Sequence, residues 1–457
     1  MSSSAFNLAK RLENLPFSGW HLKLLTAGGL GVLFDSLDAG IIAFILPALA
    51  SAWKLSPQQM GTIGSAGLLG MAVGAAVAGS VADRLGRKTV FMLTLLIFGI
   101  STGFSALSNS VAMLLVLRFL TGFGVGGEPP VVNTLTSEFS PIKYRGRMIV
   151  LQNSFWAIGW TIAALTAFLL IPRYGWQIGF LVGAVPAFYV LWLRRAIPES
   201  VRYLVKAGRL QEAEATVTQI ETACGVKPSP LAVGPAAAEV AATGSESRAS
   251  GFLALWSRPF IHRTIGVWML WFCIVFAYYG MFIWLPSIMI SKGFTITKSF
   301  EYVLTMTLSQ LPGYFASAYL IEKIGRKPVL VSFLTLSGVA AYFFGQAGTV
   351  GAILSWGAVM SFFNLGAWGV VHGYTTEIYP TRMRATGAGF AGGFGRVGGV
   401  LAPLVVGWII AAFGKQAAFA YIFDLFTVVL LLGAAAVLVF GVETMGRSLE
   451  QISAEGN

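Results

Sequence analysis

The sequence predicts an all-α membrane protein in which twelve transmembrane helices form two homologous six-helix bundles. Three observations predict this fold: the composition, the number of apolar segments, and a repeated pair of charged motifs. Of the 457 residues, 56% are hydrophobic and 11% are charged, whereas an average soluble domain carries about 25% charged residues. Most of the chain is therefore expected to lie in lipid or against other apolar helices.

Twelve apolar segments account for most of the chain. Each one approaches or exceeds the roughly 20 residues that a helix needs to cross a bilayer. They are predicted at 24–52, 58–82, 90–107, 111–137, 148–171, 177–196, 264–291, 300–321, 328–347, 350–378, 386–413 and 417–441. The polar stretch 1–23 has no short apolar core before a small-residue cleavage site, so no signal peptide is expected.

Two charged motifs occur twice, and both repeats have the same displacement. The turn at 83–88, Asp-Arg-Leu-Gly-Arg-Lys, returns at 322–327 as Glu-Lys-Ile-Gly-Arg-Lys, and the segment 138–145 returns at 377–384, in both cases 239 positions later. A shared displacement indicates an internal duplication that produces two similar halves. The predicted parts are a first bundle at 1–196, a cytoplasmic central loop at 197–263, and a second bundle with a short tail at 264–457.

The charged side chains of these motifs are too costly to bury in hydrocarbon, so they place the turns at one membrane face. Their repetition predicts a matched pair of gates that hold helix ends together when the opposite face is open. The candidate gating residues are Asp83, Arg84, Arg87, Glu138, Arg145, Glu322, Arg326, Glu377 and Arg384.

The distribution of Lys and Arg predicts the orientation of the chain. The predicted loops form two alternating sets, and the set that contains both termini holds most of the 31 Lys and Arg residues. The opposite set holds Lys54, Arg173, Lys292, Lys298 and Lys415. Because cytoplasmic loops are enriched in Lys and Arg, both termini are expected in the cytoplasm and the chain in the cell membrane.

Several kinds of partner are not expected. The net charge is +12, but the basic residues lie between apolar segments and form no patch with interleaved aromatic residues, so nucleic acid is not a predicted partner. Cys224 and Cys273 are the two cysteines and suggest neither a disulfide framework nor a zinc site. The sequence lacks a phosphate-binding Gly-x-x-x-x-Gly-Lys-Ser/Thr motif. A monomer without metal or cofactor, and without enzymatic activity, is expected.

The central loop is predicted to have two parts. Leu210, Ala213, Val217 and Ile220 recur at steps of three and four, which predicts an amphipathic helix lying on the bundle. The stretch 228–250 is rich in Ala, Gly, Pro and Ser and is typical of a flexible linker.

Two glycine patterns have the spacing Gly-x-Gly-x-x-Gly, at 122–127 and 393–398. This spacing also occurs in dinucleotide-binding sites, where it follows a strand, whereas both patterns here lie inside apolar segments predicted to be helical. Small residues let membrane helices approach closely. Close helix packing is therefore the preferred interpretation of both patterns.

Six ionisable residues lie within predicted spans and away from the charged turns. An unpaired charge at the bilayer centre costs about 2.5–3.5 kcal/mol or more, so such residues are candidates for function. They are Asp35, Asp38, Arg118, Glu128, Arg396 and Asp424. Asp424 lies near the outer end of the last span, where a solvated interfacial acid is the preferred interpretation.

Asp35 and Asp38 are three positions apart and share one face of the first helix. Asp35 lies about 16 Å from the cytoplasmic end, near mid-membrane, at the helical rise of 1.5 Å per residue. Two acids this close cannot both ionise cheaply, so a coupling proton is expected on one of them. Arg118 is expected to pair with Asp38, and two interpretations remain open for this pair: proton coupling, or a buried ion pair that holds two helices together. Glu128 precedes two prolines that are expected to disturb its helix, and both a coupling role and a packing or hinge role remain open.

Arg396 lies ten residues into the eleventh predicted span, again near the midplane. A guanidinium in this position is suited to bidentate binding of a carboxylate. The alternative is a salt bridge to another buried residue, with Glu128 as the candidate partner. Further aromatic and polar side chains in the spans are expected either to pack in the core or to line a substrate pathway. The candidates are Asn153, Trp156, Tyr278, Tyr279, Gln310, Asn364, Trp368 and His372.

Several motifs resemble those of a known family. They are the charged turns, Arg118-Phe-x-x-Gly-x-Gly, Pro198-Glu199-Ser200-x-Arg202-Tyr-Leu and Glu443-Thr-x-Gly446-Arg. These motifs resemble the major facilitator superfamily and, within it, the sugar-porter branch. Asp35-Ser-Leu-Asp38 is similar to the Asp-Gly-x-Asp element of aromatic-acid/proton symporters. The segments 126–131, 154–160 and 363–369 resemble bacterial nicotinate (niacin) transporters of this superfamily.

This resemblance implies two six-helix bundles, alternating access and a central binding site. It implies a secondary transporter that imports a small aromatic monocarboxylate, nicotinate first, coupled to protons. Asp38 and Arg118 match the proton-linked pair of sugar porters. The alternatives are a hydroxybenzoate-type aromatic acid, a sugar or polyol, and a membrane sensor that binds its ligand without transport.

Overall fold

The computed structural model describes residues 8, 10–141, 143–227, 248–258, 260–379 and 383–445. In this described part the secondary structure consists of helices and turns, without strands. The first half contains α2 Gly19–Trp53, α3 Pro57–Leu85, α4 Arg87–Ser105, α5 Val111–Phe139, α6 Arg145–Tyr174, α7 Gln177–Gly183 and α8 Val185–Ala196. The second half contains α12 Ile261–Ser291, α13 Ile296–Leu308, α14 Gln310–Leu320, α15 Arg326–Gly345, α16 Val350–Ile378 and α17 Arg384–Phe440.

Three short helices lie between the two halves in sequence: α9 Val201–Lys206, α10 Leu210–Ala223 and α11 Arg248–Leu255. The all-α prediction is confirmed. Within the described residues, 11 stretches are long and apolar enough to cross a membrane. Two of them lie in α17, which turns at Gly414, where φ is 73°. Glycine adopts this left-handed conformation at little cost.

The segment predicted at 300–321 differs from the other spans, because it is divided into α13 and α14 at Ser309. Pro312, in the first turn of α14, cannot donate the backbone hydrogen bond that a continuous helix would need at that point. Conversely, the expectation that Pro129 and Pro130 disturb their helix is wrong, because α5 runs through both of them. Membrane helices tolerate proline where neighbouring helices support the backbone.

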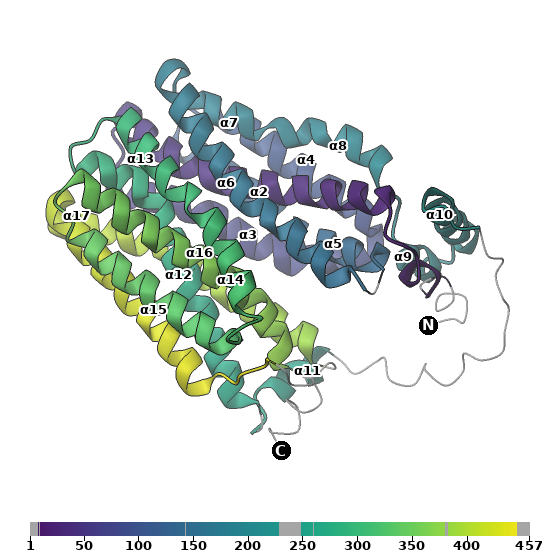
Figure 1. Ribbon diagram of the computed structural model, residues 1–457. Coiled ribbons are helices and arrows are strands. Elements are labelled where there is room, and N and C mark those ends of the chain that lie inside the picture. Colours follow the sequence, from purple (N-terminus) through teal and green to yellow (C-terminus); the bar gives the residue numbers. More distant parts are fainter. Residues whose placement is uncertain are drawn as a thin grey trace.

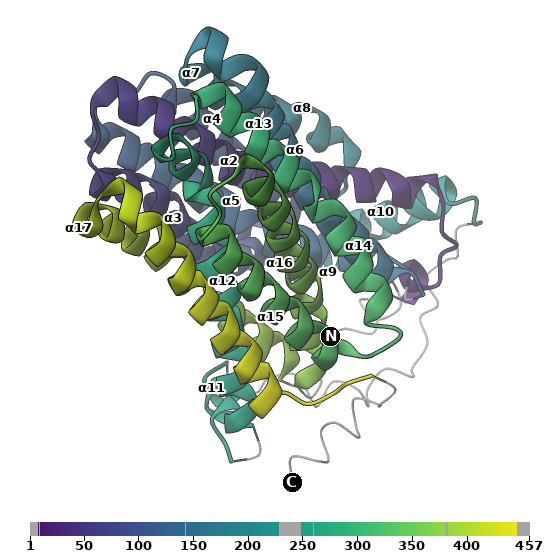
Figure 2. The same ribbon diagram turned by 60° about the vertical axis from the view of Figure 1, so that its left-hand side comes forward.

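The two halves form bundles that lie close together at one end and separate towards the other (Figure 1). They are close near α7 and α13, and they separate towards the end that carries α9, α10 and α11, an arrangement that is also visible in Figure 2. The contacts between the halves pair α3 with α17, α6 with α13, and α2 with α12. The structure is therefore open at the end where the charged turns lie.

Glycines allow α3 and α5 to pack backbone against backbone. A Cβ atom on Gly122 would clash with the carbonyl oxygen of Gly67, and one on Gly70 would clash with that of Phe119. In the second glycine pattern, a Cβ atom on Gly398 would lie 2.7 Å from the carbonyl oxygen of Phe272 on α12. The packing interpretation is thus confirmed for the first pattern, and for the second at Gly398.

The closed end is held where α3 crosses α17. Ser65 Oγ donates a hydrogen bond of 2.7 Å to the carbonyl oxygen of Val400. A Cβ atom on Gly61 would lie 2.6 Å from the carbonyl oxygen of Pro403, and one on Gly407 would lie 2.6 Å from that of Pro57. Glycine at 61 and 407 is therefore what lets these two helices touch.

A methyl group at Gly61 is expected to oppose closure of this end, because real Cβ atoms do not approach a backbone oxygen this closely. Cysteine-accessibility labelling of single cysteines at the closed end should show higher reactivity in Gly61→Ala than in the parent protein. The matched control is Gly79→Ala in the same helix, where a Cβ atom would meet nothing within 4 Å. Equal reactivity in both variants would contradict the closure role.

The predicted amphipathic helix of the central loop is present as α10, with Ala213, Val217 and Ile220 buried and Leu210 exposed. Its polar face binds the N-terminal segment. Arg11 forms ion pairs of 2.6 Å with Glu214 and 2.7 Å with Glu221, and hydrogen bonds to these carboxylates raise the pKa of Arg11. Residues 228–247 of the predicted linker lie outside the described residues, and α11 begins at Arg248.

Candidate functional site

Asp35 of α2 and Glu128 of α5 meet inside the first bundle. Both are buried, with 1% and 0% of their surface exposed, and their carboxyl groups interact directly. Gly31, one helical turn before Asp35, makes room for this arrangement, since a Cβ atom there would clash with Glu128 Oε1. None of the four carboxyl oxygens receives a hydrogen bond from a donor in the described part of the chain.

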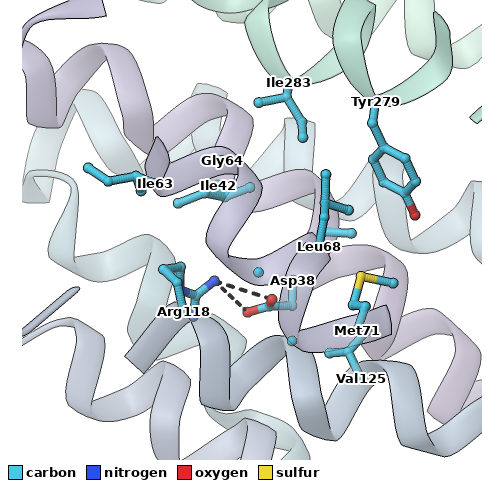
Figure 3. Close-up of a pocket in the computed structure, with 13 residues that line it drawn as sticks. Asp38, Ile42, Ile63, Gly64, Leu68, Met71, Arg118, Val125, Tyr279 and Ile283 are labelled. Atoms are coloured by element: carbon cyan, nitrogen blue, oxygen red, sulfur yellow. Dashed lines mark hydrogen bonds and ion pairs between the residues drawn. The ribbon is translucent and has the colours of Figure 1, made fainter. Parts of the chain in front are cut away.

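Asp38 and Arg118 form the ion pair that the sequence predicts, at 3.2 Å (Figure 3). Thr102 Oγ1 donates to Asp38 at 2.9 Å, and Arg118 Nη2 donates to Thr121 Oγ1 at 2.9 Å. The Arg118 guanidinium also lies 4.8 Å from the centre of the Phe180 ring. Asp38 is therefore already neutralised and hydrogen-bonded, unlike Asp35. Proton coupling by this pair stays a prediction.

A small cavity borders the Asp38–Arg118 pair. Its volume is about 30 Å³, which is roughly the volume that one water molecule occupies in the liquid. Tyr279 and Ile283 of α12 line its opposite side (Figure 3). The cavity therefore connects the ion pair of the first half to the surface of the second half.

Arg396 of α17 projects from the second half towards the same region. Its guanidinium lies within electrostatic range of Tyr279, Asp35 and His372. It is partly exposed and makes no direct hydrogen bond or ion pair with another described residue. The alternative partner Glu128 contacts Asp35 instead. A guanidinium this deep in a membrane protein and without a direct partner is available to bind an anion.

An aromatic cluster lies beside Arg396 and spans both halves. Trp156 Nε1 of α6 donates a hydrogen bond of 3.2 Å to the hydroxyl of Tyr278 on α12. The Tyr278 ring lies 5.2 Å from Trp368, and the Tyr279 ring lies 6.5 Å from Trp368. His372, one turn after Trp368 on α16, is solvent-exposed although it lies inside a span. The structure thus brings together five of the predicted substrate-site residues.

Two aromatic residues belong to this cluster although the sequence did not single them out as site residues. Trp271 packs edge-on against His372 at 4.9 Å, and its Nε1 donates to Thr375 Oγ1 at 2.8 Å. Trp160 lies 5.8 Å from Tyr278. Tryptophans at helical spacing were visible in the sequence, but the spacing alone does not tell which of them face the other half.

The polar residues predicted to line the substrate pathway differ in their surroundings. Asn153 donates to the carbonyl oxygen of Ile149 in its own helix at 2.8 Å. Asn364 is buried, and its Nδ2 atom lies 3.5 Å from Ser337 Oγ of α15. These two amides are oriented by partners outside the aromatic cluster. Gln310 is buried, and neither polar atom of its amide has a hydrogen-bond partner in the described part of the chain.

Comparison with known proteins agrees with the fold. The family model described as "Sugar (and other) transporter" matches residues 34–455. The chain belongs to this transporter family of the major facilitator superfamily. It is therefore a multi-pass membrane transporter that acts on a small molecule, and not an enzyme.

Two relatives are similar over almost their whole length. The chain is 47% identical over 447 residues to the niacin transporter NiaP of Acinetobacter baylyi, covering 98% of this chain and 99% of the relative. It is 46% identical over 428 residues to the putative niacin/nicotinamide transporter NiaP of Bacillus subtilis, covering 94% of this chain and 98% of the relative. The xylose transporter XylE from E. coli, in a partially occluded inward-open conformation, shares the fold. The TM-score is 0.72 at 16% identity, and the match covers 94% of this chain and 100% of that chain.

In this transporter, the two charged turns form matching clusters. Arg87 forms an ion pair with Glu138, and Glu199 accepts hydrogen bonds from the backbone of Arg87 at 2.8 Å and of Lys88 at 3.0 Å. Asp83 lies 3.7 Å from Arg87. Each cluster therefore ties the turn between two helices to the segment that follows the sixth or the twelfth span.

The second cluster repeats this pattern. Arg326 forms an ion pair of 3.1 Å with Glu377, and Glu443 accepts hydrogen bonds from the backbone of Arg326 at 3.0 Å and of Lys327 at 2.9 Å. Ser200 and Thr444 donate to Glu138 and Glu377 in equivalent positions. Glu199 and Glu443 lie in segments that resemble family motifs in the sequence, but the sequence pattern does not place them in these clusters.

The remaining predicted gating residues lie around these clusters. Arg145 pairs with Glu13 of the N-terminal segment at 3.0 Å. Arg84 contributes its carbonyl oxygen, which accepts a hydrogen bond from Tyr203 at 3.2 Å. Glu322 and Arg384 lie in the matching positions of the second half. A gating role for the whole set stays a prediction.

Asp83→Asn is expected to lower the transport rate more than it lowers ligand affinity, because Asp83 lies in the charged turn at the end of α3 and pairs with Arg87, outside the aromatic cluster. The measurement compares initial uptake rates and dissociation constants in the variant and the parent protein. Glu212→Gln is the matched control, since Glu212 is exposed and pairs only with its neighbour Arg209 among the described residues. Unchanged transport kinetics in Asp83→Asn would refute the gating role.

Proposed function

We propose that the protein imports nicotinate across the cell membrane by alternating access, coupled to protons. The observation that carries this proposal is Arg396, a guanidinium inside the membrane span that has no direct partner among the described residues and lies beside an aromatic cluster. A small planar monocarboxylate fits both features. The niacin transporter of A. baylyi, at 47% identity, supports nicotinate within this chemical class.

The substrate carboxylate would form a bidentate charge-assisted pair with Arg396, because the guanidinium presents two parallel N–H groups that match two carboxylate oxygens. The pyridine ring would pack against the aromatic cluster, where Trp156 and Trp368 are partly exposed and offer flat apolar surfaces. His372 is solvent-exposed beside them and has ring nitrogens that can hydrogen-bond the ligand.

Alternating access would arise from rocking of one bundle against the other. The α3–α17 contact closes one end, and the two halves separate towards the end that carries α9, α10 and α11 (Figure 2). The first charged cluster lies next to α9, through Glu199. The excess of Lys and Arg assigns the separated end to the cytoplasm. On this assignment, the proposed substrate site would face inward in this state. The outward-facing state would require the α3–α17 contact to part while the charged ends come together.

Nicotinamide is the second candidate, because the B. subtilis relative is named a putative niacin/nicotinamide transporter. It has the same ring but no carboxylate, and it would leave Arg396 without an anionic partner. Sugars and polyols have neither a negative charge for Arg396 nor a planar ring for the aromatic cluster.

A thermal-shift screen on the purified transporter tests the substrate class. Nicotinate should raise the midpoint of unfolding at concentrations where nicotinamide and xylose do not, because a ligand that binds only the folded state stabilises it by mass action. Stabilisation by 4-hydroxybenzoate instead would replace nicotinate with another aromatic acid. A response to xylose alone would overturn the carboxylate assignment.

A further inference from the structure

We propose that Asp35 and Glu128 form a single proton-binding site that is linked through Arg396 to the substrate carboxylate, so that one proton is taken up for each monocarboxylate bound. This inference rests on the proposed function, since it requires that the ligand is a carboxylate held by Arg396. It goes beyond that function because it names the proton carrier, the reason for coupling and the stoichiometry.

The first step is the contact between two acids that lack donors. The Asp35 and Glu128 carboxyl groups interact directly, are almost completely buried, and receive no hydrogen bond from the described residues. Two ionised carboxylates in contact away from water repel each other strongly, whereas one shared proton turns the repulsion into a hydrogen bond. The pair therefore holds at least one proton.

The second step excludes Asp38 from this role. Asp38 has Arg118 as its counter-charge and accepts a further hydrogen bond from Thr102. Protonation of Asp38 would leave the buried Arg118 without its partner, which is costly. The carboxyl pair has no such cation in contact and can gain or lose a proton without breaking an ion pair.

The third step is the set of groups that face the carboxyl pair from neighbouring helices. Tyr189 of α8 lies within electrostatic range of Glu128, and Tyr279 of α12 lies within range of Asp35. Asp38 lies on the same helix as Asp35. Arg396 of α17 is the cation that acts on Asp35 from the second half. The charge of the pair is therefore balanced across the interface by Arg396.

This charge balance links the binding of the ligand to the binding of a proton. A pair with one proton carries one negative charge, and Arg396 offsets it. When a monocarboxylate binds Arg396, the site gains one negative charge, and the pair restores neutrality by binding a second proton from water. An O–H bond forms on a carboxyl oxygen of the pair, while the ligand and Arg396 are joined only by hydrogen bonds. Transport would then be electroneutral, with one proton per nicotinate, and neutral nicotinamide would bring none.

The test measures proton uptake with a pH-indicator dye when nicotinate, benzoate or nicotinamide is added to the full-length transporter in weak buffer at neutral pH. The native protein should take up about one proton per bound nicotinate or benzoate and none with nicotinamide. Its nicotinate affinity should fall about tenfold per pH unit in the alkaline range, as linkage to one proton requires. In Asp35→Asn, and in the double variant Asp35→Asn/Glu128→Gln, proton uptake should be lost while nicotinate still binds, now with an affinity that changes little with pH, because Asp35 is the acid of the pair on which Arg396 acts.

The outcomes separate this inference from the proposed function. Nicotinate binding without proton uptake in the native protein would overturn the linkage and leave nicotinate as the substrate. Proton uptake that persists in both variants would overturn the assignment to Asp35 and Glu128. Benzoate binding with one proton, in the absence of nicotinate binding, would overturn nicotinate as the substrate and support the linkage. Glu212→Gln serves as the control and should behave as the native protein does, since Glu212 is an exposed residue of α10.

Discussion

Arg396→Ala is expected to weaken nicotinate binding about 10- to 150-fold, because loss of a desolvated, charged hydrogen bond costs roughly 1.5–3 kcal/mol. Nicotinamide should bind the native protein weakly and should be little affected by the substitution, since it has no carboxylate for Arg396 to hold. The measurement is a set of four dissociation constants, for both ligands in both proteins. A selective loss for nicotinate places its carboxylate at Arg396.

Arg396→Lys is the matched variant, because it keeps the positive charge and removes the planar pair of donors. A lysine ammonium cannot form the bidentate contact, so affinity for nicotinate should stay well below the native value. An equal loss of affinity for nicotinate and nicotinamide in Arg396→Ala would mean that Arg396 is structural. Equal affinity of the native protein for the two ligands would contradict the carboxylate assignment itself.

Asp35→Asn is expected to abolish accumulation of nicotinate against its gradient, while exchange of internal for external nicotinate continues. An amide in place of the carboxyl cannot carry the coupling proton, but the bundles can still change conformation with ligand bound. The measurement compares net uptake under an imposed proton gradient with counterflow of labelled nicotinate in the same vesicles. Loss of both activities would instead indicate a structural role for Asp35, and persistence of accumulation would mean that the proton is carried elsewhere.

The fold could be predicted from the sequence because membrane physics constrains it strongly. Long apolar segments must be helical in lipid, where every backbone polar group needs an internal partner. The shared displacement of the charged turns revealed the duplication without any alignment. The pairing of Asp38 with Arg118 was also predictable, since a buried arginine needs an acid and few acids lie within the spans.

The contact between Asp35 and Glu128 could not be predicted in the same way. It depends on how α2 faces α5 and on the space left by Gly31, and a sequence does not give the rotation of one helix against another. The role considered for Glu128 as partner of Arg396 was reasonable from charge alone. The structure instead places an acid beside an acid, an arrangement that favours the binding of a proton.

The matching roles of Glu199 and Glu443 in the two charged clusters could not be predicted from the sequence, for a different reason. Both acids cap a charged turn through backbone N–H groups, yet they are not separated by the 239 positions that relate the turns themselves. The segments that precede them differ in length between the halves, and a fixed displacement then fails to align them. The division of one span at Ser309 was similarly missed, because Pro312 has a different effect from the prolines of α5.

Concentrative uptake by purified transporter in liposomes tests the central claim most directly. With an inward proton gradient, labelled nicotinate should accumulate inside the liposomes above its external concentration, and a protonophore should release the accumulated label. Excess unlabelled nicotinate should compete strongly for uptake, and nicotinamide should compete weakly. Uptake that only equilibrates nicotinate, or accumulation that survives collapse of the proton gradient, would contradict proton-coupled import of nicotinate.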